Sequence, residues 1–285
     1  HQFSMVPLYL LGQATTAAYF NTGIWSAKAI KEAARYTQIK LVAATEINTE
    51  GLLTLAAQEQ WQDDPQAAYV HYTPNETIDG FEFQEVPEVG SQPLVADFSS
   101  SLLSRPLPVE RFGLIYAGAQ KNIASPGLTL AIIREDLLDR AQANTPYLYN
   151  YQTYALSNSL IHTPNTFAIY MAGLMFEWLE TQGGLSAMAE INQRKARKLY
   201  DAIDASGFYE NKIDPAYGSW MNVVFKTPSV ALDVQFVAEA KRAELLNLKG
   251  HKAVGGMRAS IYNAMPEAGI DALILFMKEF EQRYG

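Results

Sequence analysis

The strongest constraint on the fold is a series of short apolar runs that alternate with helix-like or loop segments between Thr15 and about Arg134. Runs of this kind are typical of strands buried on both faces of a parallel sheet. The segment Trp25–Tyr36 has apolar residues at helical spacing. The expected strands are Ala17–Phe20, Leu41–Ala44, Ala67–Tyr72, Leu94–Ala96, Leu114–Ala117 and Leu128–Ile133. The pattern predicts an α/β fold with a mostly parallel sheet.

The chain changes character after this region. Tyr147–Ser159 is rich in Tyr, Asn and Gln and is expected to form a long ordered loop. The elements expected after it are helices at Asn165–Thr181 and Leu185–Ala205, a strand at Ser219–Lys226, a helix at Asp233–Glu244, short strands at Leu245–Leu248 and Arg258–Tyr262, and a helix at Pro266–Tyr284. We therefore expect a large domain over residues 1–183, and a linking helix with a small α+β domain over residues 184–285.

Composition excludes several classes of protein. The net charge of −8 and the pI near 5.1 give no attraction to phosphate backbones, so we expect no nucleic-acid partner. The absence of cysteine excludes disulfides and thiolate metal sites. The longest apolar stretches, such as Ile169–Phe176, are too short to span a bilayer, and the N-terminus lacks the basic region of a secretory signal. We expect a cytoplasmic protein with no membrane partner and no metal.

Polar clusters follow three of the expected strands. These are Asn75-Glu76-Thr77, Asp97-Phe98-Ser99-Ser100 and Gln120-Lys121-Asn122. Ligands of an α/β sheet bind beyond the carboxyl ends of its strands. An acid, a lysine and hydroxyl groups at successive strand ends therefore predict a binding site.

Asp97 and Lys121 are the two residues of these clusters with the clearest chemical potential. Asp97 directly follows a strand that is expected to be buried, and a buried carboxylate is costly unless it has a positive partner. Asp97 is therefore either a counter-ion to a protonated heterocycle or a turn residue before the serines. Lys121 lies among small and apolar residues, which would lower its pKa and favour Schiff-base chemistry. By itself, this context favours an ordinary surface lysine.

Four longer motifs carry a resemblance to a known family. They are His71-Tyr72-Thr73-Pro74-Asn75-Glu76-Thr77-Ile78-Asp79-Gly80, Ala96-Asp97-Phe98-Ser99-Ser100, Ile115-Tyr116-Ala117-Gly118-Ala119-Gln120-Lys121-Asn122 and Gly255-Gly256-Met257-Arg258-Ala259-Ser260-Ile261-Tyr262-Asn263. With these four motifs in this order along the chain, the sequence resembles the phosphoserine aminotransferases over essentially its whole length. The resemblance implies the fold-type-I architecture and pyridoxal 5′-phosphate as cofactor.

The resemblance also implies roles for residues around the cofactor. Lys121 would carry the cofactor as a Schiff base and move a proton, and Asp97 would pair with the ring nitrogen. Trp25 would stack on the ring, Thr77 would bind near the phenolic oxygen, and Gln120 would reach the phosphate. Without the family, Trp25 is a core aromatic residue and Thr77 a turn hydroxyl.

His162 and Thr163 match a loop that, in the family, binds the cofactor phosphate of the neighbouring subunit. The resemblance therefore implies a homodimer with shared active sites. Read alone, Thr163 is a helix-capping residue. His162 replaces the usual asparagine, and Asn165 replaces a second proline; histidine can still donate to a phosphate.

Arg258 matches the arginine that binds the substrate α-carboxylate, and His251 and Lys252 match positions that hold the substrate phosphate. Lys252 stands where arginine is common, so it keeps the charge but loses the planar fork. Together with Lys249 these residues form a dense basic group. This group indicates an anion site, with a solvated charged loop as the alternative.

The implied reaction is transamination between phosphoserine and 2-oxoglutarate, in serine biosynthesis, with related activity on 4-phosphohydroxythreonine in pyridoxine biosynthesis. The chain starts at His1-Gln2-Phe3, which matches the end of the glycine-rich, arginine-containing phosphate loop of the family, so we expect a form that lacks the N-terminal segment. Two alternatives stay open: a catalytically impaired fragment, and a fold-type-I aminotransferase with a non-phosphorylated substrate.

Overall fold

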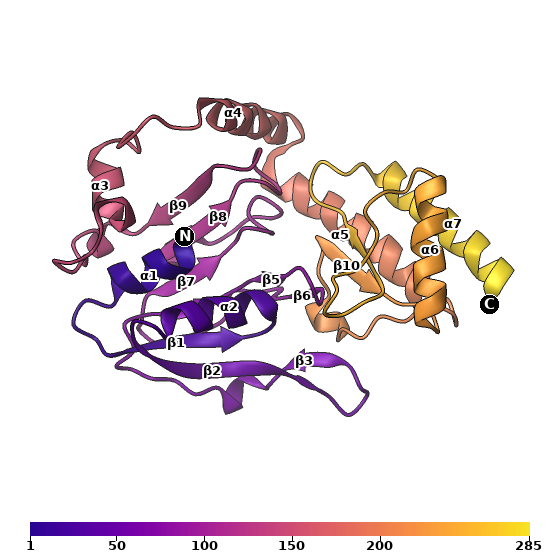
Figure 1. Ribbon diagram of the computed structural model, residues 1–285, viewed down its shortest axis with the longest axis horizontal. Helices are drawn as coiled ribbons and strands as arrows, with labels where there is room; N and C mark the ends of the chain where they lie inside the picture. The colour runs from indigo at the N-terminus through magenta and orange to yellow at the C-terminus, as the bar shows by residue number, and fades with distance from the viewer.

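The large sheet has seven strands in the order β3-β2-β1-β4-β7-β8-β9 (Figure 1). The computed structural model describes residues 1–285. The inner strands β2, β1, β4, β7 and β8 run parallel, whereas the edge strands β3 and β9 run antiparallel to their neighbours. The predicted α/β architecture with a mostly parallel sheet is confirmed.

The elements of this part are α1 (Gln2–Leu10), β1 (Thr16–Asn21), α2 (Ile24–Ala33), β2 (Gln38–Ile47), β3 (Leu53–Leu55), β4 (Val70–Tyr72), β5 (Asn75–Glu76), β6 (Phe81–Glu82), β7 (Leu94–Asp97), β8 (Leu114–Gly118), β9 (Thr129–Ile133), α3 (Tyr151–Leu156) and α4 (Thr166–Thr181). The later elements are α5 (Gly184–Asp204), β10 (Asn222–Phe225), α6 (Val230–Arg242), β11 (Met257–Ser260) and α7 (Glu267–Tyr284). None of the helices combines the length and apolarity needed to cross a lipid bilayer.

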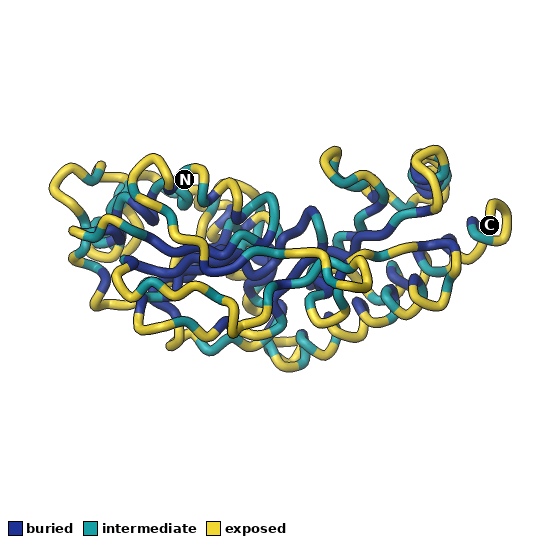
Figure 2. Tube along the Cα trace, turned by 90° about the horizontal axis from the view of Figure 1, so that it is seen from below, coloured by how far each residue is buried: buried dark blue, intermediate teal, exposed yellow.

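The large sheet is covered differently on its two faces. Because side chains alternate along a strand, Ala17 and Tyr19 pack with helices α1 and α2, while Ala18 and Phe20 face the opposite core. That second core is closed mainly by aromatic residues of the connecting segments, such as Phe98. Figure 2 shows the strands as a buried layer between segments that are exposed or half-buried.

The C-terminal elements form a separate apolar core. The antiparallel pair β10–β11 packs with α5, α6 and α7, and the buried residues of this cluster run from Ala196 to Phe280. The buried residues of the two clusters of the large sheet end at Ala172, and of the later residues only the partly buried Tyr217 packs against them. We therefore propose a division into residues 1–183 and 184–285, with α5 as the linking helix.

Three local differences from the sequence-based expectations appear. The predicted loop Tyr147–Ser159 was wrong, because Asn150 caps helix α3 by accepting hydrogen bonds from two backbone N–H groups. The predicted strand Leu245–Leu248 was wrong too, since only an isolated bridge between Lys249 and Met257 forms there. Helix α1 was not predicted; it contains a proline, Pro7, which weakens the helical signal.

Lys195 of α5 fixes the segment that follows β11. Its ammonium group is buried and donates to the carbonyl oxygens of Ile261, Tyr262 and Met265, at 3.1, 2.9 and 3.1 Å. Burial lowers the pKa of Lys195 to about 8. The three acceptors replace the water that the ammonium group loses on burial.

We predict that Lys195→Met lowers the free energy of unfolding by about 1.5–3 kcal/mol, because buried carbonyl oxygens lose a charged donor. Urea denaturation measures this. Lys198→Met, which removes a half-exposed lysine of the same helix, is the control and should change stability by less than about 1 kcal/mol. Equal losses for the two variants would contradict this account of Lys195.

Candidate active site

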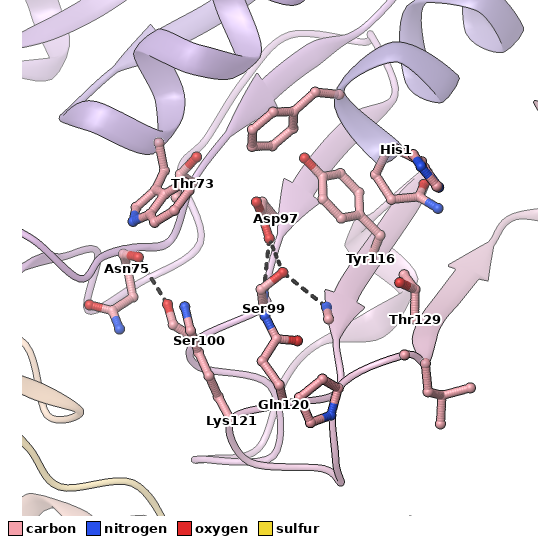
Figure 3. Close-up of a pocket in the computed structure, with 17 residues that line it drawn as sticks. His1, Thr73, Asn75, Asp97, Ser99, Ser100, Tyr116, Gln120, Lys121 and Thr129 are labelled. Atoms are coloured by element: carbon pink, nitrogen blue, oxygen red, sulfur yellow. Dashed lines mark hydrogen bonds between the residues drawn. The ribbon is translucent and has the colours of Figure 1, made fainter. Parts of the chain in front are cut away.

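The carboxyl ends of β4, β7 and β8 meet at one edge of the large sheet, because these strands are parallel neighbours. A cavity of about 580 Å³ lies there. Its lining comes from all three strand ends, from α2, from the start of α1 and from the segment that leads into β9 (Figure 3): His1, Gln2, Phe3, Trp25, Thr73, Asn75, Asp97, Ser99, Ser100, Tyr116, Gly118, Gln120, Lys121, Pro126, Gly127, Leu128 and Thr129. The volume suits a small organic ligand.

Asp97, the last residue of β7, is buried in this cavity wall. Its Oδ1 accepts hydrogen bonds from the backbone N–H of Ser99 at 3.0 Å and from the Ser99 hydroxyl at 2.5 Å (Figure 3). Burial raises the pKa of Asp97, and the Ser99 bonds oppose that rise. No side chain or backbone group of the chain donates to Oδ2, so this oxygen is free to accept from a ligand.

Lys121 lies in the turn after β8 and lines the same cavity. Burial lowers the pKa of its amine; the charge of Asp97 raises this pKa and that of Arg258 lowers it. The Lys121 Nζ is 5.9 Å from the centroid of the Trp25 ring. The structure therefore brings the lysine, the carboxylate and the indole to one cavity.

Trp25, Thr77 and Arg258 form a chain of contacts that reaches from this cavity into the C-terminal half. The Trp25 indole N–H donates to Thr77 Oγ1 at 2.9 Å, and Arg258 Nη1 donates to the Thr77 carbonyl at 3.0 Å. Thr77 itself is buried. Arg258 is on β11, in the two-stranded sheet β10–β11, and its contact with Thr77 holds it close to the cavity of the large sheet.

Of the other candidate residues, Gln120 lies in the cavity and the remaining four lie in two places outside it. Gln120 lines the cavity, and its amide folds back against Gly118, where a Cβ atom would come within 2.6 Å of Gln120 Oε1. His162 and Thr163 precede α4 and do not line the cavity of their own chain. His251 and Lys252 are also outside its lining; they belong to a loop closed by the hydrogen bond from Gly250 N–H to the Gly256 carbonyl.

Glu76 positions Trp25, a role that the sequence did not reveal. Its buried carboxylate accepts from the backbone N–H groups of Trp25 and Ser26, at 2.8 and 2.7 Å, and so caps α2. Burial raises the pKa of Glu76, while these bonds lower it. Gly23 permits this approach, because a Cβ at Gly23 would lie 2.6 Å from Glu76 Cδ.

Ser99 belongs to a polar cluster that was predicted to form the site, but its hydrogen bonds to Asp97 were not predicted, and Tyr116 was missed as part of the site. Ser99 lies two residues after Asp97, a spacing that allows an Asx turn, so this signal was present in the sequence. Tyr116 lines the cavity and its hydroxyl pairs with His71 Nε2 at 2.9 Å. Burial lowers the pKa of His71 to about 3, so the pair is neutral. No sequence signal connects residues on two different strands.

Comparison with known proteins defines the class and then the family. Residues 1–273 match the family described as aminotransferase class-V. The phosphoserine aminotransferase of Hahella chejuensis is 53% identical over 282 residues, which are 99% of this chain and 78% of that protein. The chain belongs to the phosphoserine aminotransferase family.

Solved structures agree with this assignment. The phosphoserine aminotransferase from Bacillus circulans subsp. alkalophilus superposes with a TM-score of 0.95 at 42% identity, covering 100% of this chain and 78% of that one. The pyridoxal-phosphate-bound phosphoserine aminotransferase from Trichomonas vaginalis gives a TM-score of 0.91 at 40% identity, covering 97% and 79%.

We predict that Gly23→Ala lowers the free energy of unfolding by about 1–3 kcal/mol, since the new methyl group overlaps Glu76 and the start of α2 must move. Urea unfolding followed by tryptophan fluorescence measures the change. Gly207→Ala is the control, because nothing lies within 4 Å of a Cβ at that position. If the two variants are equally stable, the close packing of Gly23 on Glu76 is not as described.

Proposed function

We propose that this chain transfers the amino group of phosphoserine to 2-oxoglutarate with pyridoxal 5′-phosphate as cofactor. The observation that carries the proposal is the convergence of Lys121 and Asp97 on one cavity beside the Trp25 ring. Membership of the phosphoserine aminotransferase family supports the choice of substrate.

The groups around the cavity fit the cofactor. The free Oδ2 of Asp97 suits a protonated ring nitrogen, and the Lys121 amine, with its lowered pKa, suits an aldehyde. The Trp25 ring offers a flat face. Gln120 and the first residues of α1 offer polar groups to a phosphate, and Thr77 adds a hydroxyl beside the indole.

The bound pyridoxal ring supplies an electron sink for the charge that develops at the substrate Cα. Asp97 keeps the ring nitrogen protonated, and Ser99 keeps the carboxylate oriented. The Lys121 amine would accept the Cα proton and then deliver it to the cofactor carbon that carried the aldehyde. The lowered pKa of this amine favours the first transfer, because more of the neutral base is present near pH 7.

Arg258 is proposed to bind the α-carboxylate of the substrate, and His251 and Lys252 its phosphate. The loop that carries His251 and Lys252 folds back on β11, because the Arg258 backbone N–H donates to the Leu248 carbonyl at 2.8 Å and Lys249 bridges to Met257. These backbone contacts hold the basic loop against the strand that carries Arg258, so the positive residues are grouped in this part of the chain. This concentration supports a dianionic substrate in a chain whose net charge is −8.

We predict that wild-type holoenzyme uses phosphoserine as amino donor far better than alanine. We also predict that Lys252→Met raises the KM for phosphoserine by roughly 10–100-fold, because the substrate loses one charged contact. Coupled assays of both donors measure this. Lys278→Met removes an exposed lysine of α7 and serves as the control. Equal use of alanine would favour a non-phosphorylated substrate, and no turnover of any donor would favour a catalytically impaired form.

We also propose a homodimer in which His162 and Thr163 reach the cofactor phosphate of the partner subunit. Both residues lie outside the cavity of their own chain, in front of the positive N-terminus of α4. Helix α4 carries several exposed apolar side chains, as expected for a surface that a second copy covers: Phe167, Ile169, Tyr170, Leu174 and Phe176.

Complementation tests this shared site. Lys121→Ala and Thr163→Glu should each be nearly inactive alone, because one lacks the amine and the other places a negative charge at the partner's phosphate. Unfolding and refolding an equal mixture should restore about a quarter of wild-type activity, since half of the dimers carry one intact site. A mixture no more active than the better single variant would contradict the shared site.

A further inference from the structure

Three buried asparagines lie beneath the Lys121 turn and belong to three distant segments of the chain. Asn122 follows Lys121 directly, Asn192 is on α5, and Asn263 is on the segment after β11. Their side-chain amides donate to three consecutive backbone carbonyls, with Asn122 bonded to Leu102, Asn263 to Leu103 and Asn192 to Ser104, at 3.1, 2.8 and 2.9 Å. We call these side chains the asparagine cluster.

The carbonyls are presented by an unusual backbone. Leu103 has a φ of 66°, a left-handed conformation that costs energy because the Cβ atom crowds the backbone carbonyl. Such strain persists where the surrounding structure fixes it, and it is frequent near functional sites. Here it turns successive carbonyls toward the asparagine cluster.

The asparagine cluster also links the Lys121 turn to the C-terminal segment that carries Arg258. Asn122 Oδ1 accepts the backbone N–H of Asn263 at 3.1 Å. Asn263 lies on the segment that continues from Arg258, and Lys195 holds the carbonyls of the same segment. Asn122 therefore connects the turn of Lys121 to the segment that directly follows the strand of Arg258.

We propose that Asn122 is a positioning residue that sets the separation between the Lys121 amine and Arg258. This inference rests on the proposed function. A substrate whose carboxylate is bound by Arg258 would present its Cα hydrogen at a fixed place. The proton would pass to Lys121 Nζ, and the electron pair left at Cα would be taken up by the cofactor ring. Proton transfer requires the donor and acceptor within hydrogen-bond reach, so a small shift of the lysine slows this step more than it weakens binding.

The test compares Asn122→Ala with Asn211→Ala in the holoenzyme. Asn211 is a matched control, because its side chain also makes one donated and one accepted hydrogen bond to the backbone, with the Val224 carbonyl and the Ile213 N–H. Rapid mixing with phosphoserine, followed by cofactor absorbance, gives the first-order rate at saturation and the substrate dissociation constant. The same rate with Cα-deuterated phosphoserine gives the isotope effect on proton transfer.

We expect Asn122→Ala to keep its bound cofactor and to bind phosphoserine within about threefold of wild type, while the saturated rate falls roughly 10–100-fold and the isotope effect rises. Asn211→Ala should keep the rate within about twofold. If Asn122→Ala does not fold, Asn122→Ser replaces it, with the same expectations.

The possible failures are distinguishable. A wild-type chain that binds cofactor but does not convert phosphoserine would overturn the proposed function and, with it, the positioning role. A wild-type chain that is active, with Asn122→Ala no slower than Asn211→Ala or slowed without a larger isotope effect, would overturn the positioning role alone.

Discussion

The burial of two oppositely charged groups at the ends of neighbouring parallel strands is the constraint on which the site depends. The register that pairs Asp97 with Tyr116 places the end of β7 beside the strand that leads to Lys121. Burial raises the pKa of Asp97 and lowers that of Lys121, so removal of water opposes the charged form of both groups. A ligand that offers a protonated ring nitrogen and an aldehyde suits both groups at once.

The remaining architecture holds these groups in place. Glu76 fixes the start of α2 and thereby Trp25, and Thr77 joins Trp25 to Arg258. On the opposite side, Asn122 joins the Lys121 turn to the C-terminal half. Most of these contacts connect residues far apart in the sequence, so the cavity is assembled from both halves of the chain. Its polar bonds are buried or partly buried, where an unpaired group is costly.

The sequence predicted the parts of the fold that local pattern determines. The apolar runs predicted the inner strands, because a strand buried on both faces needs continuous apolar residues. Their parallel arrangement also allowed the prediction that Asp97 and Lys121 belong to one site. The capping of α2 by Glu76 and the pairing of His71 with Tyr116 could not be predicted, since both depend on tertiary contacts. The helix at Tyr151 was missed because it is only six residues long and has no clear apolar periodicity, so the Asn150 cap had no helical pattern beside it.

The central claim is that one lysine amine at the end of β8 holds the cofactor. Borohydride reduction of the protein incubated with pyridoxal 5′-phosphate, followed by proteolysis and mass spectrometry, identifies the modified residue directly. The account predicts one stoichiometric modification, on Lys121. Modification of another lysine instead, such as Lys28, which lies 4.2 Å from the Trp25 ring, would contradict it, as would the absence of stable modification.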